Sequence, residues 1–480
     1  MTQNRQNFLV LLSVFLFVYA LYYKYGDWST VFDYSLYVSF GLLSFGLLFY
    51  KTEWFYFLLI ALIPISLDVG AENGAQINFP SEAMLVILLP TLFLFKPDFR
   101  TNLLKMAKHP IALLLALDIF IELISAILGT HVDISLKRVA IRLVFMIGFF
   151  GIINSLKETK KLSYPWVAYA LGLIPVMYFT LKKHAVYNFD PRVVFSICQP
   201  YFNEHTVYGA CMAFILPFMV IVLVRRKQFN WKSHYVVFWT ILLVVVTISE
   251  FLALSRAAIL SLGVSVLFLV LLQFKVSFRS IILGLILLGS VGYYFSNDIY
   301  ENIRRNESVS NDGEITNHFS SITNVNTDAS NLERINRWIC AYRMFEERPF
   351  IGFGPGTYQF EYNQFQTTEN LTYISTTKGN KGNAHSEYLM YLSEMGIFGF
   401  LIFVAIVFSS IYFGMKNHYT LEPSLMRSIN LAILLGLVSF YFHGIFNSFI
   451  DQSKMGFLFY AGLGTIVTIN LRLQNKSLYR

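Results

Sequence analysis

Apolar stretches long enough to cross a lipid bilayer follow one another along almost the whole chain. A helix needs about 20 mostly apolar residues to span the hydrocarbon core. We therefore predict an all-α polytopic membrane protein with about 12–14 transmembrane helices. The candidate spans, of which 54–67 is short and could be re-entrant, are 8–23, 31–50, 54–67, 79–95, 111–129, 139–153, 165–181, 206–224, 235–254, 257–273, 280–296, 387–414, 428–447 and 455–471.

Composition excludes the main alternatives to a membrane protein. Only 14% of the residues are charged and 55% are hydrophobic, whereas soluble domains carry about 25% charged residues. The apolar content is also too high for a disordered chain. The formal charge of +8 does not indicate a nucleic-acid partner, because the basic residues lie in short runs between apolar stretches rather than on one face. The three cysteines show no metal-ligand spacing, and we expect neither a metal nor another cofactor.

Charge between the spans predicts how the chain is oriented. If every span crosses and the N-terminus is cytoplasmic, the cytoplasmic segments hold twenty Lys or Arg, and the short outer loops about seven. This asymmetry is what the positive-inside rule requires. We therefore predict a multi-pass membrane protein with both termini in the cytoplasm.

The longest polar segment, 297–386, is predicted to be a periplasmic loop. It separates an N-terminal transmembrane bundle (1–296) from a C-terminal one (387–480) that ends in a short cytoplasmic tail. Within it, a helix is expected from Ser330 or Asn331 to Arg348, because apolar residues recur every three or four positions. We expect these residues, which are Leu332, Ile335, Ile339, Tyr342 and Phe345, to form one apolar face.

A Gly-x-Gly-x-Gly run follows this helix at Gly352, Gly354 and Gly356. It lacks the preceding strand and the distant acidic residue of a dinucleotide-binding fingerprint, so we interpret it as a structural turn. Cys198 and Cys340 are both predicted to lie outside the membrane, where a disulfide between them is conceivable.

Ionisable residues inside the spans are costly and are expected to have partners or to face a cavity. For the acids Asp118, Glu122 and Glu250 we favour buried ion pairs, with Glu122 paired to Arg142 and Glu250 to Arg256 by depth. Arginines outnumber acids near the outer boundary, and the planar guanidinium group suits phosphate oxygens. This excess indicates an anionic ligand such as a lipid-linked phosphate. The arginines that could converge there are Arg138, Arg142, Arg192, Arg256, Arg334 and Arg337.

Together these residues resemble the superfamily of O-antigen ligases and O-antigen polymerases, which includes bacterial protein O-oligosaccharyltransferases. The resemblance covers about 192–447, a little over half of the chain, and each of its motifs is short. The motifs are Arg192-Val193 before Phe202-Asn203-Glu204-His205-Thr206, Leu254-Ser255-Arg256-Ala257, Arg334-x-x-Arg337-Trp338 with Pro349, Ala384-His385-Ser386-Glu387-Tyr388-Leu389, and Glu394-Met395-Gly396-x-x-Gly399. This sequence departs from the family pattern at two places. Many relatives have Asn where this chain has Ser386, and the Glu204-His205 pair replaces a more common pair that contains Asn.

The resemblance implies transfer of a glycan from undecaprenyl pyrophosphate to an acceptor on the periplasmic face. Membrane lipids are the other expected partners. His385 then corresponds to the essential loop histidine, and Arg192 and Arg256 to arginines that hold the donor pyrophosphate. Arg138 and Arg142 are further candidates for the pyrophosphate, and Arg334 and Arg337 match the loop-helix arginines. Because pyrophosphate is a good leaving group and arginines can stabilise its charge, we expect an inverting reaction without a metal. A neutral His385 would take the proton of the acceptor hydroxyl.

The leading hypothesis is an O-antigen ligase, which joins the lipid-linked glycan to lipid A-core. The alternatives are an O-antigen polymerase and a protein O-oligosaccharyltransferase, which share the same motifs. A transporter or flippase is the alternative of another class, but it would place charges along a path at the membrane midplane. Here the charges lie at the outer boundary beside a large loop, which favours surface chemistry.

Overall fold

The computed structural model describes residues 46–48, 50–69, 77–229, 231–295, 329–367, 371, 375 and 382–474. The predicted span 8–23, most of 31–50 and the first part of the long polar loop lie outside these residues. The chain divides into two compact units, Met1–Ile60 and Ala61–Arg480. The site discussed below lies entirely within the second unit.

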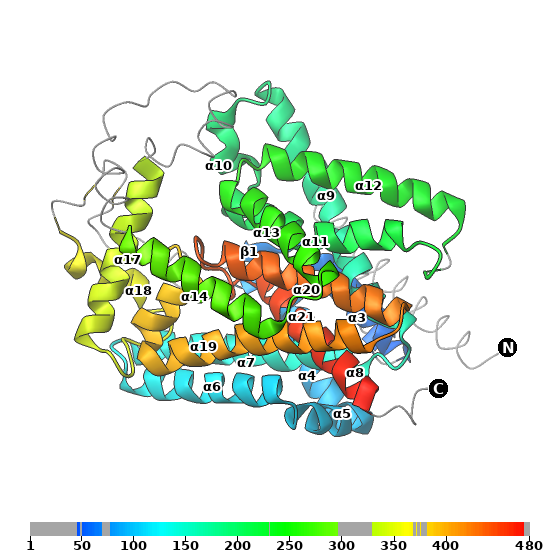
Figure 1. Cartoon of the computed structure of the whole chain (residues 1–480), viewed down its shortest axis with the longest axis horizontal. Helices are drawn as coiled ribbons and strands as arrows, with labels where there is room; N and C mark the ends of the chain where they lie inside the picture. Colours follow the sequence, from blue (N-terminus) through cyan, green and yellow to red (C-terminus); the bar gives the residue numbers. More distant parts are fainter. Residues whose placement is uncertain are drawn as a thin grey trace, which may run out of the picture. The chain divides into compact units, whose positions relative to one another are not determined.

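The described residues are mostly helical, which confirms the predicted all-α class (Figure 1). Two short strands, β1 (Leu67–Val69) and β2 (Ile77–Phe79), form an antiparallel pair in which Leu67 lies opposite Phe79. The first half contains α3 (Thr52–Leu62), α4 (Ser81–Phe95), α5 (Pro97–Ala107), α6 (Pro110–Leu128), α7 (Val132–Phe145), a π-helical turn η1 (Met146–Phe150), α8 (Gly151–Ser155), η2 (Lys160–Ser163), α9 (Tyr164–Val186), η3 (Pro191–Val193), α10 (Val194–Ile197) and α11 (His205–Val224). The second half contains α12 (Ser233–Leu252), α13 (Arg256–Gln273), α14 (Phe278–Tyr294), α17 (Ala329–Glu347), α18 (Tyr358–Glu361), η4 (Tyr362–Phe365), α19 (Glu387–Thr420), α20 (Leu425–His443) and α21 (Ser453–Gln474).

Eight helices in the described part of the chain are long and apolar enough to span a membrane. The predicted spans 54–67, 79–95 and 280–296 correspond to the shorter apolar helices α3, α4 and α14. The span predicted at 139–153 falls on α7, η1 and α8, which follow one another without a break. Neither α5 nor the strand pair is predicted from the sequence. Pro97 explains α5, because a proline fits the first turn of a helix and disfavours continuation of the helix before it.

Helix α19 is broken at Gly396, although the sequence pattern predicts a continuous span. Gly396 has φ 64° and ψ −163°, which are not helical. The segment that follows α17 packs against this break and forms hydrogen bonds with the backbone groups that the break leaves without helical partners. Pro349 O accepts from Ile397 N at 2.8 Å, and Gly354 N donates to Glu394 O at 2.8 Å. The positive φ angles of the three glycines at 352, 354 and 356 confirm the predicted turn.

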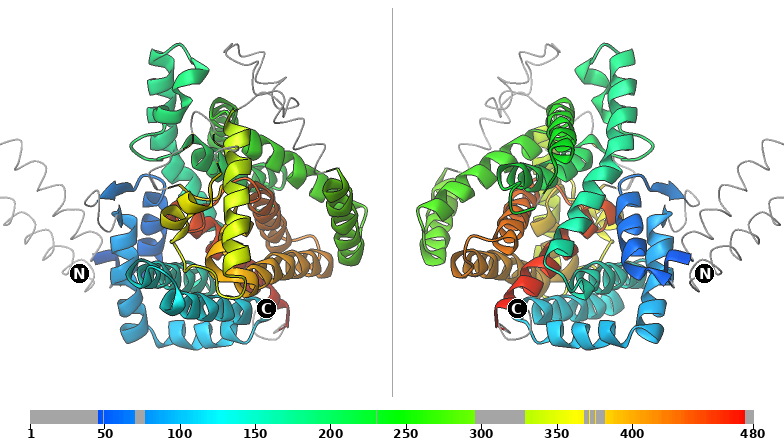
Figure 2. Two further views of the ribbon diagram at one scale, coloured as in Figure 1. Left: turned by 90° about the vertical axis from the view of Figure 1, so that its left-hand side faces the viewer. Right: turned by 90° about the vertical axis from the view of Figure 1, so that its right-hand side faces the viewer.

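Helix α17 lies across one end of the second unit, as the left-hand view of Figure 2 shows. Its bounds agree with the predicted helix, but the face that carries the predicted apolar residues is not the buried one. Tyr342 is 51% exposed, and Ile335, Ile339 and Phe345 are only half-buried. A mixed face is buried instead: its apolar residues pack in a hydrophobic cluster with Phe353 and Tyr358, and its charges are paired with each other. This face carries Glu333, Asn336, Arg337, Cys340, Ala341 and Met344.

We expect Gly396→Ala to lower the thermal midpoint of unfolding of the detergent-solubilised protein. A Cβ at this position would lie 2.4 Å from the carbonyl carbon of Phe350, and the left-handed φ adds strain of about 1–3 kcal/mol. The matched control is Gly289→Ala in α14, where a Cβ would meet nothing within 4 Å. Tryptophan fluorescence during heating measures both variants, and equal midpoints would contradict a strained, closely packed break at Gly396.

Candidate active site

His385 lies in the short segment that joins the polar loop to α19. Its backbone has φ 46°, an unusual value for a residue other than glycine. Two contacts hold this conformation: His385 N donates to Asn383 Oδ1 at 2.9 Å, and Trp338 Nε1 donates to His385 O at 3.3 Å. Strained backbone of this kind persists where its surroundings determine it, and it is typical of functional sites.

The imidazole of His385 is held in its neutral form. Burial lowers its pKa to about 3, with further contributions from the positive charges of Arg337 and Arg334 and a smaller opposing one from Asn447. At neutral pH the ring therefore carries a free lone pair, and protonation would begin only as the pH falls toward 3. Its Nδ1 atom is buried and has no hydrogen-bond partner among the described residues. A neutral imidazole with an unused nitrogen is suited to accept a proton.

Arg337 fixes the loop segment that leads into His385. Its Nε donates to Glu333 Oε1 at 2.8 Å one turn earlier in α17, and its Nη1 donates to Asn383 O at 3.2 Å. Its guanidinium carbon also lies 5.1 Å from the centre of the Tyr362 ring. A Cβ on Gly382 would lie only 1.7 Å from Arg337 Nη1, so this close approach requires glycine. These partners allow an arginine to be buried on α17.

Arg334 lies near enough to three histidines for its charge to act on each of them. Its charge acts electrostatically on His385, on His205 at the start of α11 and on His443 at the end of α20. His205 Nδ1 lies 2.7 Å from Ala253 O, which ties the start of α11 to the turn that carries Arg256. The structure therefore brings Arg334, Arg337 and His385 together and brings the Arg256 turn to the same end of the bundle.

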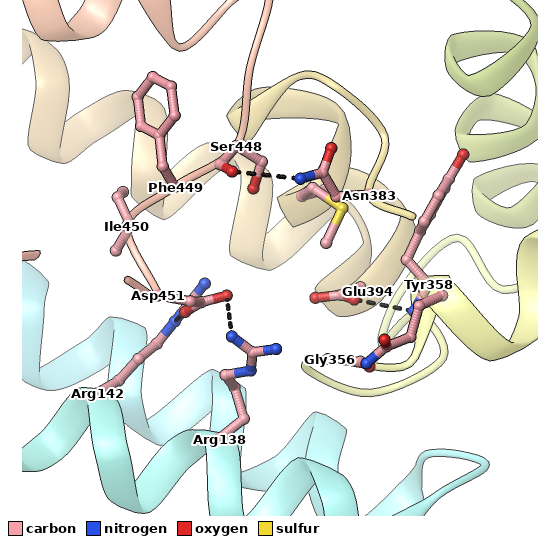
Figure 3. A network of polar contacts seen from close by, with 12 residues as sticks. Arg138, Arg142, Gly356, Tyr358, Asn383, Glu394, Ser448, Phe449, Ile450 and Asp451 are labelled. Carbon is pink, nitrogen blue, oxygen red and sulfur yellow. Dashed lines mark hydrogen bonds and ion pairs between the residues drawn. The ribbon is translucent and has the colours of Figure 1, made fainter. Parts of the chain in front are cut away.

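Ser386 and Glu387 begin α19 and attach it to the segment between α20 and α21. Ser386 Oγ accepts from Leu389 N at 3.4 Å and caps the helix. Serine and asparagine are both good N-caps, which explains how Ser386 can replace the Asn of many relatives. Glu387 Oε2 accepts from Phe449 N at 2.8 Å, and Glu387 N donates to Gly444 O at 2.7 Å. Asn383 Nδ2 adds a bond of 3.4 Å to Ser448 O (Figure 3).

This attached segment carries Asp451, which lies between two arginines of α7 (Figure 3). Asp451 Oδ2 is 2.8 Å from Arg138 Nη1, and Asp451 Oδ1 is 2.5 Å from Arg142 Nε. Arg142 is also paired with Glu122, which confirms the predicted Glu122–Arg142 ion pair. Burial alone would raise the pKa of Asp451, but the two guanidinium groups outweigh it and lower the pKa. Sequence reasoning missed Asp451. The only sign of its role in the sequence is that an acid occurs in a short segment at the same membrane depth as the two arginines.

A second carboxylate fixes the glycine turn beside this cluster. Glu394 Oε1, in the last turn before the break in α19, accepts from Tyr358 N at 2.9 Å (Figure 3). Gly356 lies close to Arg138, since a Cβ there would be 3.2 Å from Arg138 Nε. The Glu394-Met395-Gly396 motif therefore joins α19, the glycine turn and α7 in one frame.

The remaining expectations have different outcomes. Arg192 is 82% exposed and is paired with Asp190 at 2.8 Å, so the six arginines do not form a single cluster. The predicted Glu250–Arg256 pair is wrong: Glu250 is buried near Tyr208 of α11, and neither carboxylate oxygen has a hydrogen-bond partner among the described residues. Glu250 lies on the face of α12 that packs against α11, whereas Arg256 begins α13.

The conceivable disulfide between Cys198 and Cys340 does not form. Both are free thiols, each buried in its own surroundings. Burial raises the pKa of Cys198 to about 12 and that of Cys340 to about 11, so both stay protonated. Within the described ranges, no three His, Cys, Asp or Glu side chains are grouped to hold a metal ion.

Comparison with known proteins identifies one similar family. A family model described as O-Antigen ligase matches residues 241–404, which include Arg256, Arg334, Arg337 and His385. The match covers about a third of the chain and confirms the resemblance to the O-antigen ligase superfamily, a family of glycosyltransferases of the ligase and polymerase type. No curated protein matches the chain.

We expect Asp451→Asn to destabilise the protein by about 3 kcal/mol or more, because it leaves the buried Arg142 and the half-buried Arg138 without their shared carboxylate. The matched control is Asp190→Asn, which breaks the pair with the exposed Arg192 and should change the stability little, because solvent screens this pair. Unfolding in detergent, followed by circular dichroism, compares the two variants. Equal small effects would show that the Asp451 cluster does not hold the site together.

Proposed function

We propose that this chain is an O-antigen ligase that works at the periplasmic face of the bacterial inner membrane. In the proposed reaction, a glycan passes from undecaprenyl pyrophosphate to a hydroxyl of lipid A-core. The main support is the convergence of Arg334, Arg337 and His385 in one buried site, within the segment that matches the O-antigen ligase family. Cations beside a neutral imidazole are what transfer from a diphosphate donor requires.

The proton step rests on His385. The acceptor hydroxyl oxygen attacks the anomeric carbon opposite the diphosphate, the bond from that carbon to the diphosphate breaks, and the anomeric centre inverts. His385 takes the hydroxyl proton while the electron pair leaves with the diphosphate. The donor anion would offset the charges of Arg334 and Arg337, and so raise the low pKa of His385 when a proton must be accepted. Fixed arginines stabilise the leaving charge, so the scheme uses no metal.

The arginines divide into two groups in this proposal. Arg256 and the loop arginines Arg334 and Arg337, at the end of the bundle that carries His385, bind the diphosphate, and the exposed Arg192 contributes to donor binding from outside this cluster. Arg142 is 2% exposed and is held by two carboxylates, so its main task is to fix Asp451. Arg138 is 29% exposed, which leaves one side of its guanidinium group for the donor.

A deletion strain tests the acceptor. Surface glycans are separated on a gel, and lipid-linked glycans are extracted in parallel. Bare lipid A-core together with accumulated lipid-linked polymer supports the ligase. Core bearing a single repeat unit would instead indicate a polymerase, and normal lipopolysaccharide with missing glycoproteins would indicate a protein O-oligosaccharyltransferase.

We expect His385→Ala to abolish glycan transfer while the protein still inserts and folds. A positioned general base contributes about 10²–10⁴-fold in rate. His131→Ala is the control, because His131 lies at the same end of the bundle but is 39% exposed, and its ring lies beside Glu361 and Phe360. Complementation of the deletion strain compares the variants, and transfer by His385→Ala would remove His385 as the base.

Arg256→Lys should also reduce transfer, by about tenfold or more. A lysine supplies one charge but not the two parallel hydrogen bonds that a guanidinium group gives to phosphate oxygens. Arg100→Lys in α5 is exposed and serves as the control. Initial rates with purified donor and acceptor measure the effect, and a wild-type rate for Arg256→Lys would rule out its role in binding the diphosphate.

A further inference from the structure

A basic and aromatic groove lies at the turn between α11 and α12, away from the candidate active site. Its volume is about 590 Å³, and it is lined by Arg226, Lys227, Trp231, Ser233, Val236 and Val237. The two cations are exposed, and the lining includes no acid. The groove therefore offers two positive charges and a hydroxyl group beside an apolar wall.

Connectivity places this groove at the opposite end of the bundle from His385. The start of α11 and the end of α12 meet where His205 contacts Ala253 O, close to Arg334. The other ends of these two antiparallel helices meet again at the turn that forms the groove. The positive-inside pattern predicts that this turn is cytoplasmic, at the level of the inner-leaflet headgroups.

The aromatic side of the groove is fixed by packing. Phe229 is 2% exposed and anchors the turn in the protein. The Trp231 ring lies 5.3 Å from that of Trp239 and 5.9 Å from that of Phe229. Tryptophan prefers the boundary between headgroups and acyl chains, because it has an apolar ring and one polar N–H. Trp231 therefore marks where the bilayer surface meets the groove.

An apolar stripe continues from the groove along α12. Val237, Ile241, Val244 and Ile248 recur every three or four residues, and each is 47–60% exposed. No Asp or Glu occurs between Arg225 and Ser249, so neither the turn nor this stretch of α12 opposes an anion. The charges at one end and the stripe below them match the shape of a phospholipid, with its headgroup at the turn and an acyl chain along the helix.

We propose that this groove binds the headgroup of an anionic phospholipid of the cytoplasmic leaflet, with one acyl chain along α12. Arg226 and Lys227 contact the phosphate, and Ser233 can donate a hydrogen bond to its oxygens. Trp231 and the two valines of the lining hold the glycerol end of the acyl chains. The site is independent of glycan transfer and anchors the α11–α12 hairpin in the membrane.

Native mass spectrometry of the purified full-length protein, titrated with phosphatidylglycerol or with phosphatidylcholine of the same acyl chains, tests this site. The wild type should retain phosphatidylglycerol preferentially. A basic residue near an anionic lipid contributes about fivefold to affinity, so R226Q with K227Q should weaken binding by about thirtyfold. The matched control is K108Q with K275Q, which removes two exposed charges from other turns predicted to be cytoplasmic.

Three results would overturn the proposal: unchanged retention in the double variant, an equal loss in the control, or equal affinity for phosphatidylcholine. A second measurement reports position directly. Phosphatidylglycerol brominated along its chains should quench the fluorescence of the wild type more than that of W231F. Equal quenching of the two proteins would also count against the site, even if the charge variants failed to fold.

Discussion

The carboxylate of Asp451 is only 13% exposed and therefore needs charged partners, and this requirement organises the site. Arg138 and Arg142 supply the partners from α7, and Glu122 balances the second charge of the cluster. The same segment is held by Glu387 through Phe449 N. An ion cluster of this kind gains little over apolar packing, but it is costly to break, so it specifies one arrangement of the helices that contribute to it.

The break in α19 connects this ion cluster to the polar loop. In a continuous helix the backbone groups would bond to one another, and none would be left to bond to the segment after α17. At Gly396 the helix is interrupted, and the glycine turn forms hydrogen bonds with the exposed backbone groups. The Glu394 carboxylate also accepts a hydrogen bond from Tyr358 N. The segment from Ala384 to Glu394 is thus fixed at both ends, which holds His385 in its strained conformation beside Arg334 and Arg337. Burial and these two charges keep its imidazole neutral.

Much of this site could be predicted from residues whose chemistry is local. The glycine turn, the helix before it and the Glu122–Arg142 pair follow from spacing and depth, and all three are present. The buried face of α17 could not be predicted, because hydrophobicity does not indicate that Arg337 is paired with Glu333 and covers Tyr362. Asp451 was missed for the same reason, since its partners lie far away in the sequence.

The sequence by itself determined an all-α membrane protein that resembles the O-antigen ligase superfamily, because apolar length and a small set of ordered motifs are properties of the chain alone. Only the tertiary structure decided which charges meet. Arg192 forms a pair within its own turn, Arg142 is committed to two carboxylates, and Glu250 lies against α11 instead of Arg256. The physical reason is that a buried charge takes the partner that packing brings within a few ångströms, and spacing along the chain does not fix that distance.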